Sequence, residues 1–267
     1  MPNETSPASQ ANIVKPAKAA QPGLIRSSAA VLFEMAGVIP FLAIAGIAAG
    51  LSIAPAVFGF DLLRPLIESV PRWAYYPLLG LSLVVCYFIY GLALILIAPL
   101  LNLILGGRLK PFKGPAVSLK CLPWYIHASL TLVVRYTFLE IITPTPFSQI
   151  YYRLMGMKIG RNVWINTSAI ADPSLIEFED RVTIGGSASI MAHHAQGGNI
   201  VVEPVKICHG ATIGMRAIIM GGVEVGPKAK VLAGSFVLPN SKIPAGETWG
   251  GIPARKLDLK KLREVEE

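Results

Sequence analysis

A six-residue period runs through the second half of the chain and limits its fold more than any other feature. In its longest unbroken run, aliphatic residues recur at Ile207, Ile213, Ile219, Val225, Val231 and Val237. A second register of small or aliphatic residues lies two positions earlier, from Ala211 to Ser235. Neither the 3.6-residue period of a helix nor simple strand alternation produces this spacing. The period predicts a parallel β-helix over residues 158–255, in which three hexads form one triangular coil.

Glycine follows the aliphatic position in several hexads, at Gly160, Gly185, Gly214 and Gly226. We expect glycine there because it tolerates the backbone conformation that a corner demands.

The period is interrupted twice. One extra residue lies between Ile165 and Phe178, and 17 residues, two hexads plus five, separate Ile190 from Ile207. The second interruption predicts a loop that leaves the coil, and functional residues often lie on loops held by a rigid scaffold.

The first half of the chain is strongly apolar. No charged residue occurs from Met35 to Gly59 or from Trp73 to Gly107, and about 20 apolar residues cross a bilayer. We therefore predict a pair of transmembrane helices within residues 29–120, preceded by a disordered tail over residues 1–28. Pro40 and Pro55 are expected to kink or bound the first helix. Four charged residues mark a short connection between the helices: Asp61, Arg64, Glu68 and Arg72.

Residues 121–157 are apolar only over short stretches and predict interfacial helices. A third span ending near Ile142 is the alternative, against which Arg135 and Glu140 argue because ionised groups are costly within a bilayer. Arg108 and Lys110 follow the second span, and positively charged flanks favour the cytoplasmic side. Because two spans leave both ends on one side of the membrane, both ends are predicted to lie in the cytoplasm. This predicts a multi-pass protein of the inner (cytoplasmic) membrane whose β-helix faces the cytoplasm, followed by a C-terminal helix or tail over residues 256–267.

The residues from about 145 to 255 resemble hexapeptide-repeat acyltransferases, which form left-handed β-helices. More specifically, they resemble one unit of the C-terminal membrane region of poly-lysine-synthetase-like peptide synthetases. The matching stretches are Thr145-Pro146, Tyr151 to Gly160, Val182 to Gly185, and Ile243 to Arg255. The motif that closes the β-helix in hexapeptide-repeat acyltransferases reads Gly251-Ile252-Pro253-Ala254-Arg255 here, with Ile252 where asparagine is usual. The adenylation and carrier domains of the peptide synthetases are not in this sequence, so the resemblance implies no amino-acid activation.

The resemblance implies acyl transfer from acyl-CoA or a carrier-bound thioester to an amine or hydroxyl acceptor. Such transfer needs a general base, and histidine is suited to it. The family places this histidine at a coil edge beside a loop, the position that His193 and His194 hold here. The alternative is a pair of solvated loop histidines. His209 in the coil and His127 in the interfacial region are weaker candidates.

The base also needs an acceptor to orient it. Four acids one coil earlier are equal candidates, although a solvated surface charge explains each of them as well: Asp172, Glu177, Glu179 and Asp180. A basic rim for the phosphates of coenzyme A is expected from Lys228, Lys230, Lys242, Arg255 and Lys256, although a solvated face explains any single lysine equally well. We expect no metal.

Two other functions compete with the acyltransferase. A γ-class carbonic-anhydrase-like enzyme needs zinc histidines spaced by five, but the fifth residue after His209 is Gly214. A non-catalytic scaffold would use the β-helix only to form a trimer. The flat sides of the coil predict a homotrimer in either case. The net charge of +8 fits a membrane partner, since no nucleic-acid-binding motif accompanies it. The three cysteines show no paired pattern.

Overall fold

The computed structural model describes residues 28–116 and 118–258. Contacts divide the chain into two units, residues 1–36 and 37–267. The described part of the first unit is the beginning of helix α1 (Ser28–Glu68). The predicted disordered tail therefore lies outside the described residues except for Ser28. The predicted C-terminal helix or tail is described only to Asp258, and its first residue closes strand β18 (Arg255–Lys256).

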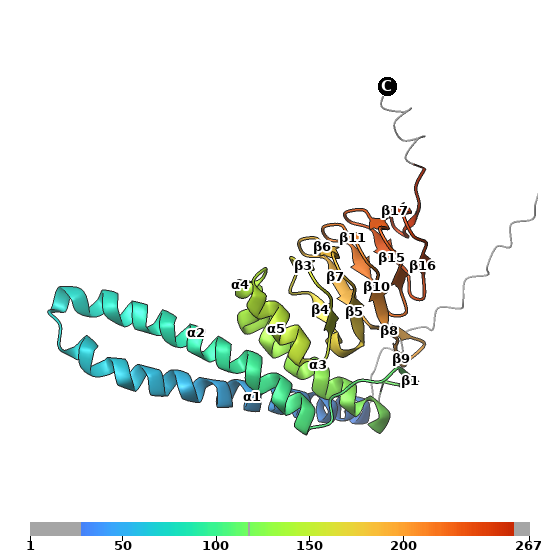
Figure 1. Ribbon diagram of the computed structural model, residues 1–267. Helices are drawn as coiled ribbons and strands as arrows, with labels where there is room; N and C mark the ends of the chain where they lie inside the picture. The colour runs from blue at the N-terminus through green and yellow to red at the C-terminus, as the bar shows by residue number, and fades with distance from the viewer. Residues whose placement is uncertain (1–27, 117, 259–267) are drawn as a thin grey trace, which may run out of the picture. The chain divides into compact units, whose positions relative to one another are not determined.

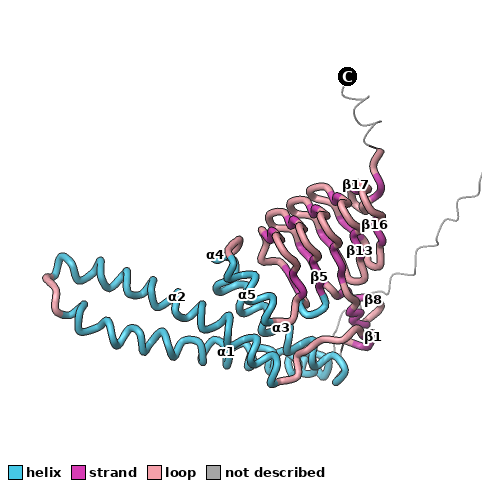
Figure 2. The backbone as a smooth tube through the Cα atoms, in the orientation of Figure 1, coloured by secondary structure: helices cyan, strands magenta, loops and turns pink. Residues whose placement is uncertain are grey.

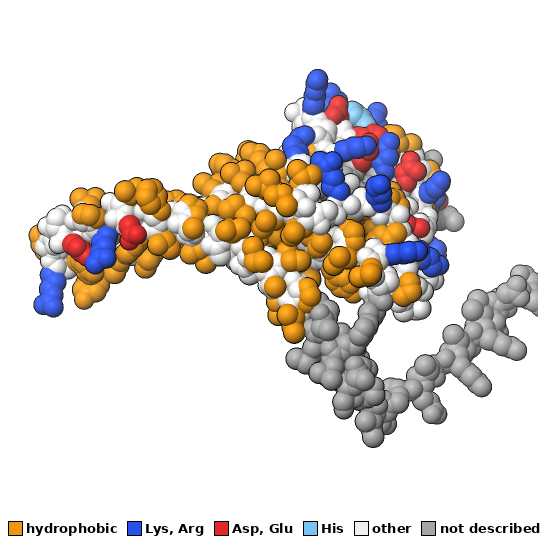
Figure 3. Space-filling view, turned by 90° about the horizontal axis from the view of Figure 1, so that it is seen from below, with side chains coloured by type: hydrophobic (Ala, Val, Ile, Leu, Met, Phe, Trp, Pro, Cys, Tyr) orange, Lys and Arg blue, Asp and Glu red, His pale blue; other side chains and the backbone are white. Residues whose placement is uncertain are grey.

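Helix α1 and helix α2 (Arg72–Ile104) form a hairpin joined at residues 69–71. Pro40 and Pro55 lie inside α1 and do not bound it. The predicted polar connection is wrong in its extent, because Asp61 and Glu68 belong to the last turns of α1. Figure 3 shows hydrophobic side chains over the visible face of this hairpin, with charged side chains near the turn.

Residues 119–154, within the stretch for which the sequence predicts interfacial helices, are largely helical. The turn η1 (Leu119–Cys121), helix α3 (Leu122–Val134), the π-helical turn η2 (Arg135–Leu139) and α4 (Glu140–Ile142) follow one another directly, and α5 (Pro146–Leu154) comes after a break. Within the described part of the chain, three stretches are long and apolar enough to cross a membrane: Ile39–Glu68, Arg72–Ile104 and Leu119–Ile142.

The third of these stretches lies between the hairpin and the β-helix (Figure 1). Ser129 Oγ donates to the carbonyl oxygen of Phe41 in α1 at 2.6 Å. Near its start, Trp124 Nε1 donates to Asp172 at 3.0 Å, and near its end Glu140 accepts from Ser168 Oγ at 2.7 Å. Trp124 and Glu140 are about 24 Å apart along a helix, yet both reach the first coil of the β-helix. The stretch therefore lies across the end of the coil.

The coil itself has three walls of parallel strands, stacked as Figure 2 shows. The first wall contains β2 (Lys158–Ile159), β5 (Ile176–Phe178), β10 (Val205–Ile207), β13 (Glu224–Val225) and β16 (Lys242–Ile243). The second contains β3 (Trp164–Ile165), β6 (Thr183–Ile184), β11 (Thr212–Ile213), β14 (Lys230–Val231) and β17 (Thr248–Gly250), with β18 antiparallel at its edge. The third contains β4 (Ile170–Ala171), β7 (Ser189–Met191), β12 (Ile218–Ile219) and β15 (Phe236–Val237).

The aliphatic residues of the six-residue period fill the interior of these walls. Ile184, Ile190, Ile207, Ile213 and Ile219 are fully buried. In the strand register, Lys206 of β10 lies beside Glu224 of β13, and Ile207 beside Val225, one coil later. The prediction of N-terminal apolar helices followed by a left-handed parallel β-helix is confirmed.

The glycines that follow the aliphatic positions serve a different purpose from the one expected. None of the four has a left-handed backbone conformation. Instead, a Cβ on Gly185 would lie 2.6 Å from the backbone nitrogen of Met215, and one on Gly226 would lie 2.7 Å from that of Ala245. Glycine is needed here because the next coil passes too closely for a side chain.

Both interruptions of the period fall at one corner of the coil. At the first, β4 is followed by Asp172, with a φ of 63°, and by the turn η3 (Pro173–Leu175). At the second, the predicted loop is a hairpin of β8 (His193–Gln196) and β9 (Asn199–Val202). Since Ala171 pairs with Met191 across the two coils, the ends of β4 and β7 lie one above the other. Strand β1 (Phe112–Pro115), which the sequence did not predict, pairs with β9.

Candidate functional site

His193 and Asp172 meet at this corner. The residue Asp172 is 1% exposed, and its Oδ2 lies 2.5 Å from Nδ1 of His193. An ionised carboxylate can only accept a hydrogen bond, so Nδ1 of His193 carries a proton, and in the neutral imidazole the lone pair is then on Nε2. The His193 side chain is 26% exposed. The imidazole is therefore held in one tautomer, partly open to solvent.

Trp124 of α3 completes the arrangement. Its Nε1 donates to Oδ1 of Asp172, and its ring lies 5.1 Å from that of His193, nearly edge to face. Both carboxylate oxygens of Asp172 are thus occupied, one by the tryptophan and the other by the histidine. Sequence reasoning missed Trp124, which lies 48 residues from Asp172 in the chain and carries no local motif.

The site is supported by a small apolar cluster. Ile200 and Val202 of β9 pack with Cys121, and Phe112 and Trp124 pack against them. This cluster joins the hairpin that carries His193 to β1 and to the start of α3. The histidine is consequently held by elements from both halves of the chain.

The other predicted histidines lie elsewhere. His194 is the next residue on β8, and successive residues of a strand face opposite sides; its Nδ1 is buried with no hydrogen-bond partner among the described residues. His127 is fully buried, with its Nδ1 3.1 Å from the carbonyl oxygen of Gly107. Its side chain therefore faces the protein interior.

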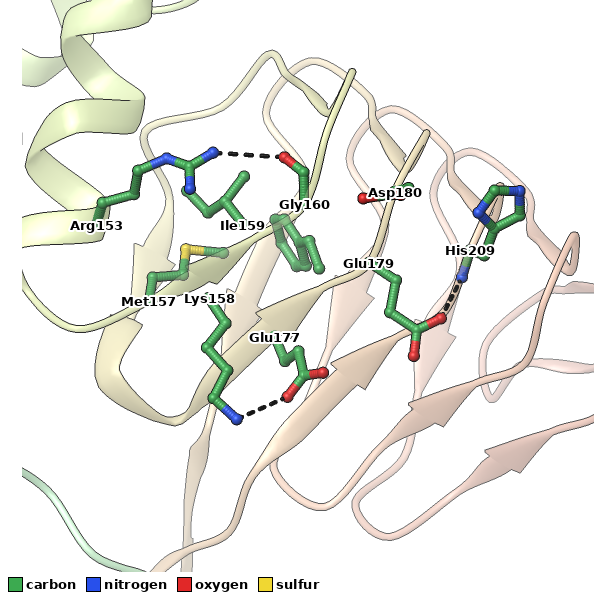
Figure 4. Close-up of a pocket in the computed structure, with 10 residues that line it drawn as sticks. Arg153, Met157, Lys158, Ile159, Gly160, Glu177, Glu179, Asp180 and His209 are labelled. Carbon is green, nitrogen blue, oxygen red and sulfur yellow. Dashed lines mark hydrogen bonds and ion pairs between the residues drawn. The ribbon is translucent and has the colours of Figure 1, made fainter.

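Three of the four candidate orienting acids line a separate groove of about 630 Å³, together with His209 (Figure 4). Glu177 pairs with Lys158 at 3.2 Å, and Asp180 accepts from the backbone of Arg161 at 2.7 Å. Glu179 pairs with Lys206 at 2.8 Å. The Lys206 hydrogen bond, aided by the backbone N–H of His209, lowers the pKa of Glu179. Of the four acids, Asp172 is the one that the fold brings to His193, and for this residue the interpretation as a solvated surface charge is wrong.

The predicted basic rim is not assembled around His193 within one chain. Lys228 and Lys230 lie where the first wall passes into the second, whereas His193 lies where the third wall passes into the first. Arg255 and Lys256 lie on β18 at the edge of the second wall, and Lys256 is paired with Glu247.

Among residues 28–116 and 118–258, no group of three or more histidine, cysteine or acidic side chains is placed to hold a metal ion. The carbonic-anhydrase-like alternative therefore has no ligand set in the described part of the chain.

Fold and sequence together define a hexapeptide-repeat, left-handed β-helix protein. No family model matches the chain. Over 142 residues it is 25% identical to the Delta-poly-L-ornithine synthetase of Acinetobacter baumannii, and the match covers 52% of this chain and 10% of the synthetase. The chain thus spans about a tenth of that relative's length.

Solved structures with a similar fold include two acetyltransferases. A maltose O-acetyltransferase from Clostridium difficile 630 is 16% identical with a TM-score of 0.43, covering 55% of this chain and 92% of its own. A galactoside acetyltransferase in complex with coenzyme A is 16% identical with a TM-score of 0.42, covering 59% and 90%. The resemblance inferred from the sequence is confirmed.

Proposed function

We propose that this protein is a membrane-anchored acyltransferase that moves an acyl or aminoacyl group from a thioester to an amine or hydroxyl acceptor. The observation that carries the proposal is the chain of hydrogen bonds from Trp124 through Asp172 to His193. It leaves Nε2 of His193 as a base at a loop-bearing corner, which is where the resembled family uses one. The donor is acyl-CoA or a carrier-bound thioester.

The reaction needs one proton to move twice. His193 Nε2 takes the proton of the acceptor hydroxyl or amine as its oxygen or nitrogen attacks the thioester carbonyl. The tetrahedral intermediate then collapses, the carbon–sulfur bond breaks, and His193 gives its proton to the departing sulfur, so that the free thiol leaves and the imidazole is neutral again. Asp172 stabilises the imidazolium that exists between the two transfers.

A purely structural scaffold does not explain this corner. A buried carboxylate loses its hydration, and this cost is offset only by the hydrogen bonds that it accepts. Asp172 accepts one of these bonds from a partly exposed histidine instead of from the coil backbone. A scaffold would need only glycine or asparagine at this φ of 63°, without a buried charge.

The membrane arrangement that we propose has two spans, α1 and α2. The third apolar stretch meets the first coil near both its ends, through Trp124 and Glu140, and a helix crossing the bilayer would meet it at one end only. With two spans, the β-helix lies on the cytoplasmic side of the inner membrane together with the basic residues after α2. A homotrimer would bring Lys228, Lys230, Arg255 and Lys256 of one copy toward the corner of another.

The test measures thiol release by the full chain in detergent from acetyl-CoA and from an aminoacyl thioester of N-acetylcysteamine. A panel of amines and sugar hydroxyls serves as acceptors. His193→Ala should lower the turnover rate by roughly 10²–10⁴, whereas the neighbouring His194→Ala is the matched control and should change it little. If the effects are reversed, the base is His194. Full activity in the double variant would show that neither histidine is the base.

A further inference from the structure

Trp124 has an unusual place in the fold. It lies in the first turn of α3, a helix that packs on α2 and, through Ser129, on α1. Its indole Nε1 is nevertheless directed away from the apolar helices, toward the buried carboxylate of the β-helix. A tryptophan N–H can only donate, so Oδ1 of Asp172 must remain an acceptor on that side.

We propose that Trp124 is a positioning residue that fixes the orientation of Asp172 and thereby the tautomer of His193. This inference rests on the proposed function for its catalytic meaning, but the tautomer itself is a property of the resting protein. Trp124 belongs to the helical half of the chain, which anchors the protein. The tautomer of the catalytic histidine therefore depends on a residue of the anchoring half.

Asp172→Asn reveals the role of the tryptophan because the two sides of an amide differ. Asparagine accepts the φ of 63° at this position as readily as aspartate does. With Trp124 present, the amide oxygen must face the indole N–H, so the amide NH₂ faces His193. Nδ1 of His193 then has to accept, its proton moves to Nε2, and the base is lost. The turnover rate should fall roughly 10²–10⁴-fold.

Removing the indole donor frees the amide to turn. In the double variant Trp124→Phe with Asp172→Asn, the ring packing is kept, and the amide oxygen can face His193 and restore the proton to Nδ1. The double variant should therefore turn over roughly tenfold faster than Asp172→Asn alone. A merely structural tryptophan predicts the opposite order, because two defects at one site would then add.

The control is Trp164→Phe, which makes the same chemical change at an exposed tryptophan on β3. It should not rescue Asp172→Asn. Rescue by both substitutions, or by neither, would overturn the role assigned to Trp124.

A second measurement is independent of activity. The chain has four histidines, so selective ¹⁵N-histidine labelling can follow the ring nitrogens of His193, assigned by its loss in His193→Ala. The wild-type protein should show a protonated Nδ1, Asp172→Asn a protonated Nε2, and the double variant a protonated Nδ1 again. An unchanged tautomer in Asp172→Asn would refute the positioning role. The expected switch without any thiol release would keep that role and refute acyl transfer.

Discussion

The close stacking at Gly214 allows a prediction whose size can be worked out from the structure. A Cβ there would lie closest to the backbone nitrogen of Ala233 and 2.6 Å from the carbonyl carbon of Leu232, whereas ordinary contact begins at 3.4 Å. Relief of the Leu232 contact alone needs the coils to separate by about 0.8 Å, and the closer contact with Ala233 needs more. They are tied by the bond from the Gly214 N–H to the Val231 carbonyl at 2.7 Å, so separation weakens a ladder whose strands lie about 4.8 Å apart. Overpacking of this kind costs about 1–3 kcal/mol or more.

Gly234→Ala is the matched control. Gly234 has a φ of 67°, and among the described residues nothing beyond its chain neighbours lies within 4 Å of where an alanine methyl group would be. Alanine there meets only the strain of a left-handed backbone, about 1–2 kcal/mol. Part of that strain is offset by the smaller entropy of the unfolded chain.

The measurement is thermal unfolding of both variants in detergent, followed by circular dichroism. Each kcal/mol corresponds to about 2–4 °C for a domain of this size, so Gly214→Ala should have the lower midpoint by several degrees. If Gly234→Ala is the less stable of the two, conformational freedom rather than coil spacing explains the glycines, and the reasoning is wrong.

Three more outcomes concern the coil and its placement. Ile213→Ala removes a fully buried side chain and should cost about 2–5 kcal/mol in chemical unfolding. Lys206 lowers the pKa of Glu179 in the folded protein. The ion pair therefore stabilises the folded state fully at pH values above the pKa of the unfolded carboxyl group, and this stabilisation is lost as the pH falls through the pKa of the folded one. Glu179→Gln should therefore lower the unfolding midpoint at neutral pH but not in strong acid, and an equal loss at both would contradict the pair. A cysteine in place of the exposed Lys242 should react with a membrane-impermeant thiol reagent only after lysis, because the β-helix is expected to face the cytoplasm. The native cysteines are buried and should give little background labelling. Labelling of intact cells would place the β-helix outside.

The walls of the coil could be predicted because their physics is local and repetitive. Each interior position, such as Ile213 or Val231, must be apolar for the same reason as the one before it, so the period is visible without any distant contact. The apolar helices were predictable for a similar reason. The role of Gly214 could not be predicted. Glycine is required both where two coils approach closely and where the backbone is left-handed, so the residue type alone does not distinguish the two.

The candidate site was only half predictable. The 17-residue interruption pointed to His193 and His194 without separating them. Asp172 and the three acids that follow it looked equivalent, because the contacts of each depend on which wall of the coil it lies on. One signal was available: with three hexads to a coil, the two interruptions fall one coil apart at the same corner, and Asp172 lies in the first of them. Trp124 had no such signal, because its contact depends on how α3 lies across the end of the coil.

The hairpin of β8 and β9 leaves the coil between two strands whose neighbours above and below remain in register. A segment inserted at that corner does not shift the pairing of any other hexad. The exposed tip of the hairpin, Ala195 to Gly198, can therefore change in length and composition over evolutionary time while the stack and His193 stay in place. Related chains could acquire new acceptor preferences by exchanging this tip alone, and the same exchange offers a way to redirect the protein in the laboratory without rebuilding its core.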